Sequence, residues 1–468
     1  MNYSHDDENF PLTRFESMLK TNDILFFDSN EFENIIHHYL ENGKISLAKR
    51  AIKLGLSQHP SSVNLRLFQV EILVIENKFT EADDILDMLH DLEPNNEEIY
   101  IQKANVLSKQ DEHEKAINIL LTAIDISSTP AEDSDLYALI GMEYLFLDQF
   151  DNAVIYFKKC LESDPSDYSA LHNIVYCYDF LDLNQDAISY LNNFLDSNPY
   201  CEVAWHQLGR QYFAIKDYNK ANAAFDFAII SDDTFVGAYI EKGKVLEKLK
   251  QYEEAIENYK ITLALDEPTS FALLRIGYCY EKLGQEDMAL QFFKKTVEDD
   301  ALLDKGWIAI TKFYMKRLNY QKALHYINKA VHIDGENVLY WKLFATINKR
   351  LNFLEEAEIG YKRTLELGNY ELDTWLDRSD ILIALGEYDA AIFNLLQAAE
   401  FYPENSEIEY RLGGLYFTTL QTEKGRFHLK NGLRLNIDYS FIITELFPKL
   451  IDRPIIKAII SESKKTSN

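Results

Sequence analysis

The sequence has few of the features that mark covalent cross-linking or membrane insertion. It contains 4 cysteines in 468 residues, with no CxxC pair, and we expect three of them to serve as small apolar residues of the core. No run of 18 apolar residues occurs, which excludes a membrane-spanning helix by that criterion. The first ten residues, MNYSHDDENF, are acidic and lack the apolar core of a signal peptide. We therefore expect a cytoplasmic protein with reduced thiols.

Basic residues are also scarce relative to acidic ones. There are 47 Lys and Arg against 76 Asp and Glu, and the net charge is −29. Such a surface repels phosphate backbones, so we expect no nucleic acid among its partners. Only 10 prolines and 17 glycines occur, while 47% of the residues are hydrophobic and 26% are charged. This composition is typical of a folded protein with long helical segments.

Recognisable catalytic motifs are missing from the chain. It contains no P-loop, GxGxxG, HExxH or GxSxG sequence. His37 and His38 are adjacent, so on a helix they would point to different sides and chelate one metal ion poorly. His172 and His206 lie one 34-residue period apart without a further Cys or His ligand. We expect no enzymatic activity, no metal site and no cofactor.

A strong pattern is present in residues 202–235. Apolar residues with helical spacing occur on both sides of a short polar turn, and a glycine and alanines occur where two helices would approach closely. The pattern consists of Trp205, Leu208, Gly209 and Tyr212, followed by Ala221, Phe225 and Ala228. In the order W-x2-L-G-x2-Y, it resembles the tetratricopeptide repeat, a helix–turn–helix unit of 34 residues. A single hairpin cannot bury this surface alone, so such units stack in arrays.

The pattern recurs at a fixed period. Repeats start at 29, 63, 97, 134, 168, 202, 236, 270, 304, 338, 372 and 406, in steps of 34 residues except for one of 37 after residue 97. The extra residues fall in Ser127–Asp133, a predicted loop by composition. Counted from each start, position 20 always holds a small residue. The set is Ala48, Ala82, Ala116, Ala153, Ala187, Ala221, Ala255, Ala289, Ala323, Ala357, Ala391 and Gly425.

The resemblance implies an all-α fold, a right-handed superhelical solenoid of about twelve repeats with capping helices. We assign residues 1–28 to an acidic tail and N-terminal cap, 29–439 to the repeats, and 440–468 to C-terminal capping helices and a loose tail. Thr13 and Glu16 have the spacing of a capping box. Ile24, Leu25, Phe26 and Phe27 are expected to be covered because they are strongly apolar.

The first three repeats match the pattern least well. Ile36 and Val70 replace the glycine at position 8, so we expect looser helix packing in this part of the array. At the other end, Asp452, Arg453 and Pro454 predict a fresh helix start. It leads into Ile455, Ile456, Ile459 and Ile460, which are expected to pack on the last repeat.

The resemblance also implies where a partner would bind. In the family, positions 2, 5, 9 and 12 of the first helix face a concave groove. In repeats five to ten these positions, with one neighbour, combine bases and aromatic rings inside an acidic chain, a combination that suits peptide recognition. The candidate groove residues are His172, Tyr176, His206, Arg210, Phe213, Lys244, Tyr278, Lys312, Lys316, Lys342 and Lys349.

The function expected from these features is a protein–protein interaction scaffold or adaptor. Its partner would be another protein or a peptide, with acidic or carboxylate groups facing the basic residues. Two alternatives stay open: a peptide-responsive regulator, and the regulatory subunit of an enzyme carried on another chain. The frequent Asn, Ile, Lys and Tyr favour a bacterial origin, while the oligomeric state is left open.

A test of the helix register follows from the alanine series. Ala221→Leu is expected to lower the free energy of unfolding by about 1–3 kcal/mol, because a larger side chain overpacks the contact between two helices. Urea unfolding followed by circular dichroism measures the change. An unchanged midpoint would mean that Ala221 does not lie between the paired helices.

Overall fold

The computed structural model describes residues 10–21, 25–127, 130–265 and 269–466. Over these ranges the chain forms α-helices, two short 3-10 helices and no strand, which confirms the all-α prediction. The α-helices are α1 (Phe10–Thr21), α2 (Ser29–Glu41), α3 (Ile45–Gln58), α4 (Val63–Ile75), α5 (Phe79–Leu92), α6 (Glu97–Lys109), α7 (His113–Ile126), α8 (Pro130–Phe146), α9 (Phe150–Ser163), α10 (Tyr168–Phe180), α11 (Asn184–Ser197), α12 (Glu202–Ala214), α13 (Tyr218–Ser231), α14 (Val236–Lys248), α15 (Tyr252–Ala264), α16 (Thr269–Lys282), α17 (Glu286–Asp299), α18 (Asp304–Lys316), α19 (Tyr320–Ile333), α20 (Val338–Arg350), α21 (Leu354–Glu366), α22 (Leu372–Leu385), α23 (Tyr388–Phe401), α24 (Ser406–Thr418), α25 (Thr422–Leu435), α26 (Phe441–Leu446) and α27 (Pro454–Thr466).

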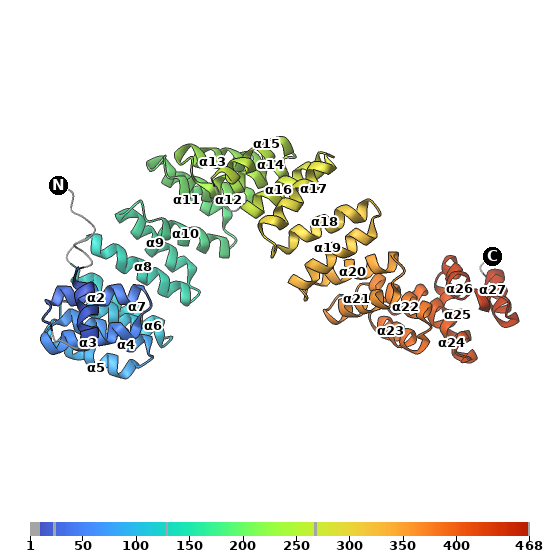
Figure 1. Ribbon diagram of the computed structural model, residues 1–468, viewed down its shortest axis with the longest axis horizontal. Helices are drawn as coiled ribbons and strands as arrows, with labels where there is room; N and C mark the ends of the chain where they lie inside the picture. The colour runs from blue at the N-terminus through green and yellow to red at the C-terminus, as the bar shows by residue number, and fades with distance from the viewer. Residues whose placement is uncertain (1–9, 22–24, 128–129, 266–268, 467–468) are drawn as a thin grey trace. The chain divides into compact units, whose positions relative to one another are not determined.

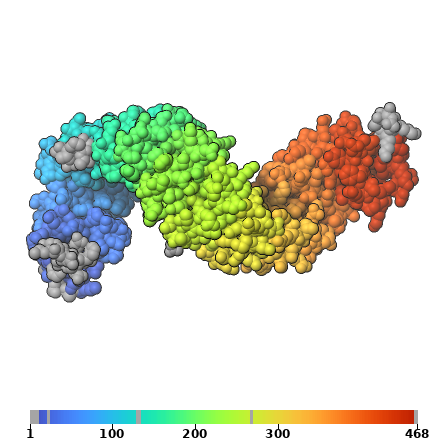
Figure 2. Space-filling model, turned by 90° about the horizontal axis from the view of Figure 1, so that it is seen from above, coloured from blue at the N-terminus to red at the C-terminus, as the bar shows by residue number. Residues whose placement is uncertain are grey.

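The helices from α2 to α25 follow one another as first and second helices of successive hairpins. The chain divides into two compact units, Met1–Ala238 and Tyr239–Asn468. Within each unit, segments of neighbouring colour, and so neighbouring in sequence, lie side by side (Figures 1 and 2). Each unit is therefore a stack in which a helix packs mainly on the helices next to it in the chain, as expected of a repeat solenoid.

The turn inside each hairpin has the same backbone geometry throughout. Position 15 of every repeat has a positive φ, and the residue there is a glycine in three repeats and an L-residue in the others, including Leu318 (φ 55°) and Leu420 (φ 61°). In the repeat that starts at 202, the amide of Asp217 donates to the carbonyl of Tyr212 at 2.9 Å, and that of Lys216 to Phe213 at 3.0 Å. These two bonds form a Schellman motif, which satisfies the last carbonyls of the first helix.

The interior of a hairpin explains the glycine at position 8. A Cβ on Gly209 would lie 2.6 Å from the Phe225 ring, and one on Gly141 would lie 2.7 Å from the Phe157 ring. The glycine thus leaves room for an aromatic ring at position 24 of the second helix. In the repeat that starts at residue 29, position 8 is Ile36 instead of glycine and position 24 is the aliphatic Ile52. Both side chains are buried.

The small residues at position 20 are buried as predicted. Ala221 is 0% exposed, and every other alanine of the series is also 0% exposed. Cys160, Cys177 and Cys279 are buried and Cys201 is half-buried, and all four are free thiols. The prediction that cysteines serve as small apolar residues of the core is confirmed at the three buried positions.

The N-terminal prediction needs two corrections. Helix α1 begins at Phe10, so Thr13 lies inside the helix and Thr13–Glu16 is not its capping box. Phe15 and Phe27 are fully buried, but Phe26 is 63% exposed and Leu25 is 37% exposed. Residues 25–28 form neither helix nor strand, and Phe26 lies at the surface while the neighbouring Phe27 faces the core. Ile24 and the acidic residues before Phe10 lie outside the described residues.

The predicted loop before the fourth repeat is also partly wrong. Helix α8 already begins at Pro130, so residues 130–133 belong to the helix, which starts four residues before the first residue of the repeat at 134. Proline is tolerated in the first turn, where its missing N–H has no intrahelical partner.

The C-terminal segment packs on the last repeat. Helix α26 is followed by the 3-10 turn Pro448–Leu450 and by α27, which begins at the predicted Pro454. Ile456 and Ile459 are buried at 1% and 4% exposure, and Phe447 is buried at 5%. A Cβ on Gly414 would collide with the Phe447 ring, so this glycine lets the capping segment approach α24. The division into 1–28, 29–439 and 440–468 stays a prediction.

The positive φ at position 15 generates a test with a matched pair of variants. Leu318→Gly is expected to raise the free energy of unfolding by about 0.5–1 kcal/mol. The left-handed conformation strains an L-residue by about 1–2 kcal/mol, and this relief exceeds the roughly 0.5–1 kcal/mol that the greater entropy loss of glycine costs. Gly284→Leu, at the same position one repeat earlier, should lower it by about 1 kcal/mol or more. Denaturant unfolding measures both, and equal shifts of the same sign would contradict the assignment of strain to this position.

Candidate functional site

The first unit contains five of the candidate groove residues, on α10 and α12. We call the side of the first helices that carries positions 2, 5, 9 and 12 the inner face. On it, the amide of Gln207 donates to His172 Nδ1 at 2.6 Å, and Arg210 donates to Gln207 Oε1 at 3.3 Å. Desolvation and the positive charge of Arg210 lower the pKa of His172. The neutral imidazole can therefore act as the acceptor in this chain of hydrogen bonds.

A second buried glutamine continues this polar network. Gln211, like Gln207, is 1% exposed. Its amide donates to Asp179 at 2.6 Å and its carbonyl accepts from Asn184 at 3.0 Å. The two glutamines connect neighbouring first helices, because each bonds to a side chain of α10 from its place on α12. Sequence analysis missed them, since a glutamine on a helix is ordinarily exposed.

The aromatic candidates of this unit differ in accessibility. Tyr176 is 52% exposed and lies near Phe180, whose ring stacks on Phe150 at 4.1 Å. Phe213 is half-buried and contacts Tyr218 edge-to-face at 5.5 Å. His206 is half-buried, with ring centroids 5.7 Å from Phe225 and 5.1 Å from Phe235. Tyr176 is thus the aromatic ring of this group that offers most surface to a partner.

Four of the five candidate groove lysines in the second unit are paired with carboxylates. Lys244 bonds to Glu241 at 2.7 Å on the same helix. Two pairs connect different helices, Lys316 with Glu286 and Lys349 with Asp377, each at 2.7 Å. Lys342 on α20 pairs with Glu371, the residue that precedes α22. Lys312 is exposed and forms no ion pair with any described residue. The inner face is therefore less basic than the number of its lysines suggests, because carboxylates next to most of these lysines neutralise their charge.

Tyr278, the remaining candidate, is half-buried and serves packing as well as surface. Its ring contacts Phe293 edge-to-face at 5.2 Å, and the Arg275 guanidinium lies 5.9 Å from its centroid. Burial is the main cause that raises the pKa of Tyr278, and Glu281 adds to it. The hydroxyl thus stays protonated at neutral pH.

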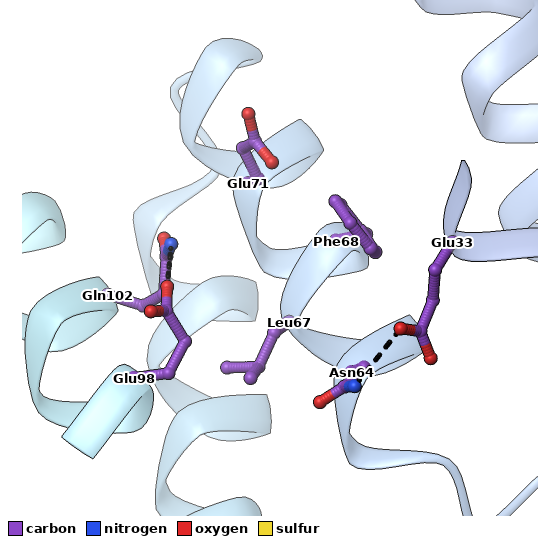
Figure 3. A pocket seen from close by; sticks show the side chains of 7 residues that line it. All are labelled: Glu33, Asn64, Leu67, Phe68, Glu71, Glu98 and Gln102. Carbon is purple, nitrogen blue, oxygen red and sulfur yellow. Dashed lines mark hydrogen bonds between the residues drawn. The ribbon is translucent and has the colours of Figure 1, made fainter. Parts of the chain in front are cut away.

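A cavity of about 180 Å³ lies on the inner face of the first three hairpins (Figure 3). Three consecutive first helices contribute to it: α2, α4 and α6. Its lining is acidic and apolar, and consists of Glu33, Asn64, Leu67, Phe68, Glu71, Glu98 and Gln102. All except Phe68 and Gln102 occupy positions 2, 5 or 9, the positions that the resemblance assigns to the groove.

The polar groups of this cavity are unequally satisfied. Glu33 accepts hydrogen bonds from Ser29 at 3.1 Å and Asn64 at 3.2 Å. Glu98 accepts from the amide of Gln102 at 2.9 Å. Glu71 forms no hydrogen bond or ion pair with a described residue. Burial and the nearby Glu98 raise the pKa of Glu71, while His37 opposes that shift.

These lining residues are not among the candidates predicted from the sequence, although most of them occupy the repeat positions that face the groove in the family. The groove positions were read only in repeats five to ten, where lysines and aromatic rings stand out against an acidic chain. In the first three repeats the same positions carry glutamates, which look like an ordinary solvated face in a protein with 76 acidic residues. The cavity emerges only when the three helices are placed side by side.

No group of three or more His, Cys, Asp or Glu side chains could hold a metal ion over the described residues. Among the same residues, no helix is both long and apolar enough to cross a membrane.

Comparisons with known proteins were made against family models and solved structures. A model described as tetratricopeptide repeat matches residues 97–130, 134–167, 236–266 and 372–405, and a second model of that description matches 271–302. No curated protein sequence matches the chain.

Solved structures show similarity over parts of the chain. MamA is 30% identical over 35% of this chain and 95% of that chain, with a TM-score of 0.31. A tetratricopeptide repeat protein from Parabacteroides merdae is 14% identical over 53% of this chain and 98% of that chain, with a TM-score of 0.40. YrrB, described as a TPR protein with an unusual peptide-binding site, is 15% identical over 38% of this chain and 92% of that chain, with a TM-score of 0.31.

The regular hairpins, the buried small residue at position 20 and the Schellman turns define an α-helical repeat protein. The chain belongs to the tetratricopeptide repeat family, whose models match five of its repeats. Membership in this family supports a role as a scaffold for protein–protein interaction.

The ion pairs of the second unit generate a test with an internal control. Lys349→Glu is expected to lower the free energy of unfolding by roughly 1 kcal/mol, because it removes a pair and places two carboxylates together. Lys312→Glu, with no carboxylate partner, should change it by less than about 0.5 kcal/mol. Thermal or urea unfolding of both variants measures the difference. Equal stabilities would show that the Lys349 pair contributes nothing measurable.

Proposed function

We propose that this protein is a scaffold that holds a segment of another protein against the inner face of its first helices. The observation that carries the proposal is the cavity on α2, α4 and α6, because three consecutive repeats contribute to its lining from equivalent positions. A concave site with an apolar base and a few polar groups is the usual form of a binding site. In a repeat stack the same face recurs on every first helix, which suits an extended ligand.

A second feature of the first unit supports the same face. Tyr176 exposes 52% of its surface beside Phe180, which is 60% exposed. Both lie on α10, one turn apart, and Phe150 packs against Phe180 from α9. Exposed rings held by their neighbours lose little side-chain freedom when a partner binds, and aromatic anchors of this kind dominate many interfaces.

The expectation of acidic groups on the partner stays a prediction for repeats six to ten. Lys312 could form an ion pair with a partner carboxylate directly, since its ammonium group is not already paired with a described residue. At Lys316 and Lys349 a partner carboxylate would first have to displace Glu286 or Asp377. Such an exchange of one exposed ion pair for another contributes little affinity.

The two alternative functions predicted from the sequence, a peptide-responsive regulator and a regulatory subunit of an enzyme, can be distinguished by identifying the bound partner. A short peptide as the captured partner would favour the peptide-responsive regulator, and an enzyme at equal stoichiometry would favour the regulatory subunit. The cytoplasmic location expected from the sequence also stays a prediction.

Site-specific cross-linking in the producing cells tests the proposal. The photoreactive residue p-benzoylphenylalanine would replace Tyr176 on the inner face or Ile155 on the second helix α9, which are 52% and 53% exposed. We expect a defined cross-linked protein from position 176 and none from position 155, because only the first helix presents the inner face. Mass spectrometry identifies the product.

A third variant places the same residue at Phe68, in the cavity. Cross-links at 68 and 176 to one protein would support binding along the inner face. Cross-links from position 155 alone, or of equal yield at 155 and 176, would overturn the proposal.

A further inference from the structure

We propose that the cavity on α2, α4 and α6 receives a positively charged side chain, arginine or lysine, of the bound protein segment. This inference rests on the proposed function and specifies the partner's chemistry at that site. It concerns the first three hairpins alone, in which all seven lining residues lie. It differs from the acidic partner groups expected beside the lysines of the second unit.

Charge complementarity is the first argument. Three of the seven lining residues are glutamates and none of the seven is basic. The carboxylate of Glu71 forms no hydrogen bond with a described residue. Among the same residues, the Glu98 carboxylate is bonded only to the neutral amide of Gln102. Two carboxylates on adjacent first helices are thus available for a cation. A guanidinium or ammonium group would form charge-assisted hydrogen bonds there, which are stronger than neutral ones.

Gln102 provides a second, independent observation. Its side-chain carbonyl oxygen is buried and accepts no hydrogen bond from a described residue. The amide orientation is constrained, because exchanging oxygen and nitrogen would turn the oxygen toward the Glu98 carboxylate. A buried acceptor without a donor is costly. A ligand N–H group that reaches this oxygen from the cavity would satisfy it.

The shape of the cavity fits a long side chain better than a bare ion. Its volume of about 180 Å³ greatly exceeds the roughly 30 Å³ of one water molecule in the liquid. Leu67 and Phe68 supply an apolar surface between the carboxylates, along which the methylene groups of arginine or lysine can pack. The glutamates do not form a group that could hold a metal ion within the described residues.

The electrostatic state of Glu71 agrees with a ligand-binding role. Burial is the main cause that raises its pKa, and Glu98 raises it further. A raised carboxyl pKa means that the ionised form is disfavoured in the folded state. The folded protein is therefore destabilised at pH values above the pKa that Glu71 has in the folded state. This destabilisation disappears at pH values below the pKa that Glu71 has in the unfolded chain. A nearby cation would remove this penalty, so binding and ionisation of Glu71 support each other.

Selection from a displayed library of random twelve-residue peptides tests the inference on the full chain. Three proteins are compared: wild type, the double variant Glu71→Gln and Glu98→Gln, and the matched control Glu81→Gln and Glu114→Gln. The control removes two exposed glutamates from the second helices of neighbouring repeats, outside the cavity lining. We expect wild type and control to enrich peptides with arginine or lysine beside an aliphatic residue, and the cavity variant to lose this enrichment.

Titration calorimetry then measures the most enriched peptide as a synthetic probe. The cavity variant should bind it at least tenfold more weakly than wild type, and the control variant within about twofold. Replacing the peptide's arginine by citrulline, or its lysine by norleucine, should cause a similar loss with wild type and little further loss with the cavity variant. Thermal unfolding verifies the fold. The cavity variant should be about as stable as wild type at neutral pH, or more stable.

The outcomes separate this inference from the proposed function. Enriched peptides without a basic residue, unchanged binding by the cavity variant, or no enrichment on wild type would each overturn the basic-side-chain assignment. Cross-linking at Phe68 and Tyr176 would in those cases still support inner-face binding. Cross-linking confined to position 155 would overturn the proposed function, whatever peptides are enriched.

Discussion

The close approach of the two helices inside each hairpin is the contact on which the rest of the structure depends. A methyl group at position 20, as in Ala221, allows the second helix to lie against the first. At position 8, Gly209 leaves space for the ring of Phe225. The space left by the small side chain on one helix is thus filled by a larger side chain of the other helix, as in a densely packed interior. Because all hairpins have nearly the same shape, successive hairpins can stack in the same way within each unit.

The turn geometry is a consequence of this close approach. A second helix that starts only a few residues after the first must reverse direction sharply, and the left-handed residue at position 15 provides the reversal. The chain accepts strain at Leu318 and Leu420 to keep this geometry. Packing of the helices on both sides therefore outweighs the local preference of these residues.

The polar residues of the inner faces fall into two groups with different consequences. Gln207 and Gln211 in the first unit, and the pair Lys349–Asp377 in the second, are engaged with other side chains of the chain itself. They hold neighbouring helices in register and are poor candidates for partner recognition. Glu71 and Glu98 have unused hydrogen-bonding capacity beside an apolar surface. Recognition is more favourable where such groups are not already satisfied, since no internal bond has to be broken first.

The sequence by itself determined the repeat and the helix pairs, because small residues at a fixed period leave few ways to bury the apolar stripes. Position 20 and the isoleucines of α27 could be placed from residue type alone. The extra turn of α8 and the exposure of Phe26 could not, since composition does not show whether a helix extends into a polar segment. Only the tertiary structure decided which charges remain available. An ion pair such as Lys349–Asp377 joins residues from different repeats, and the cavity needs three helices side by side.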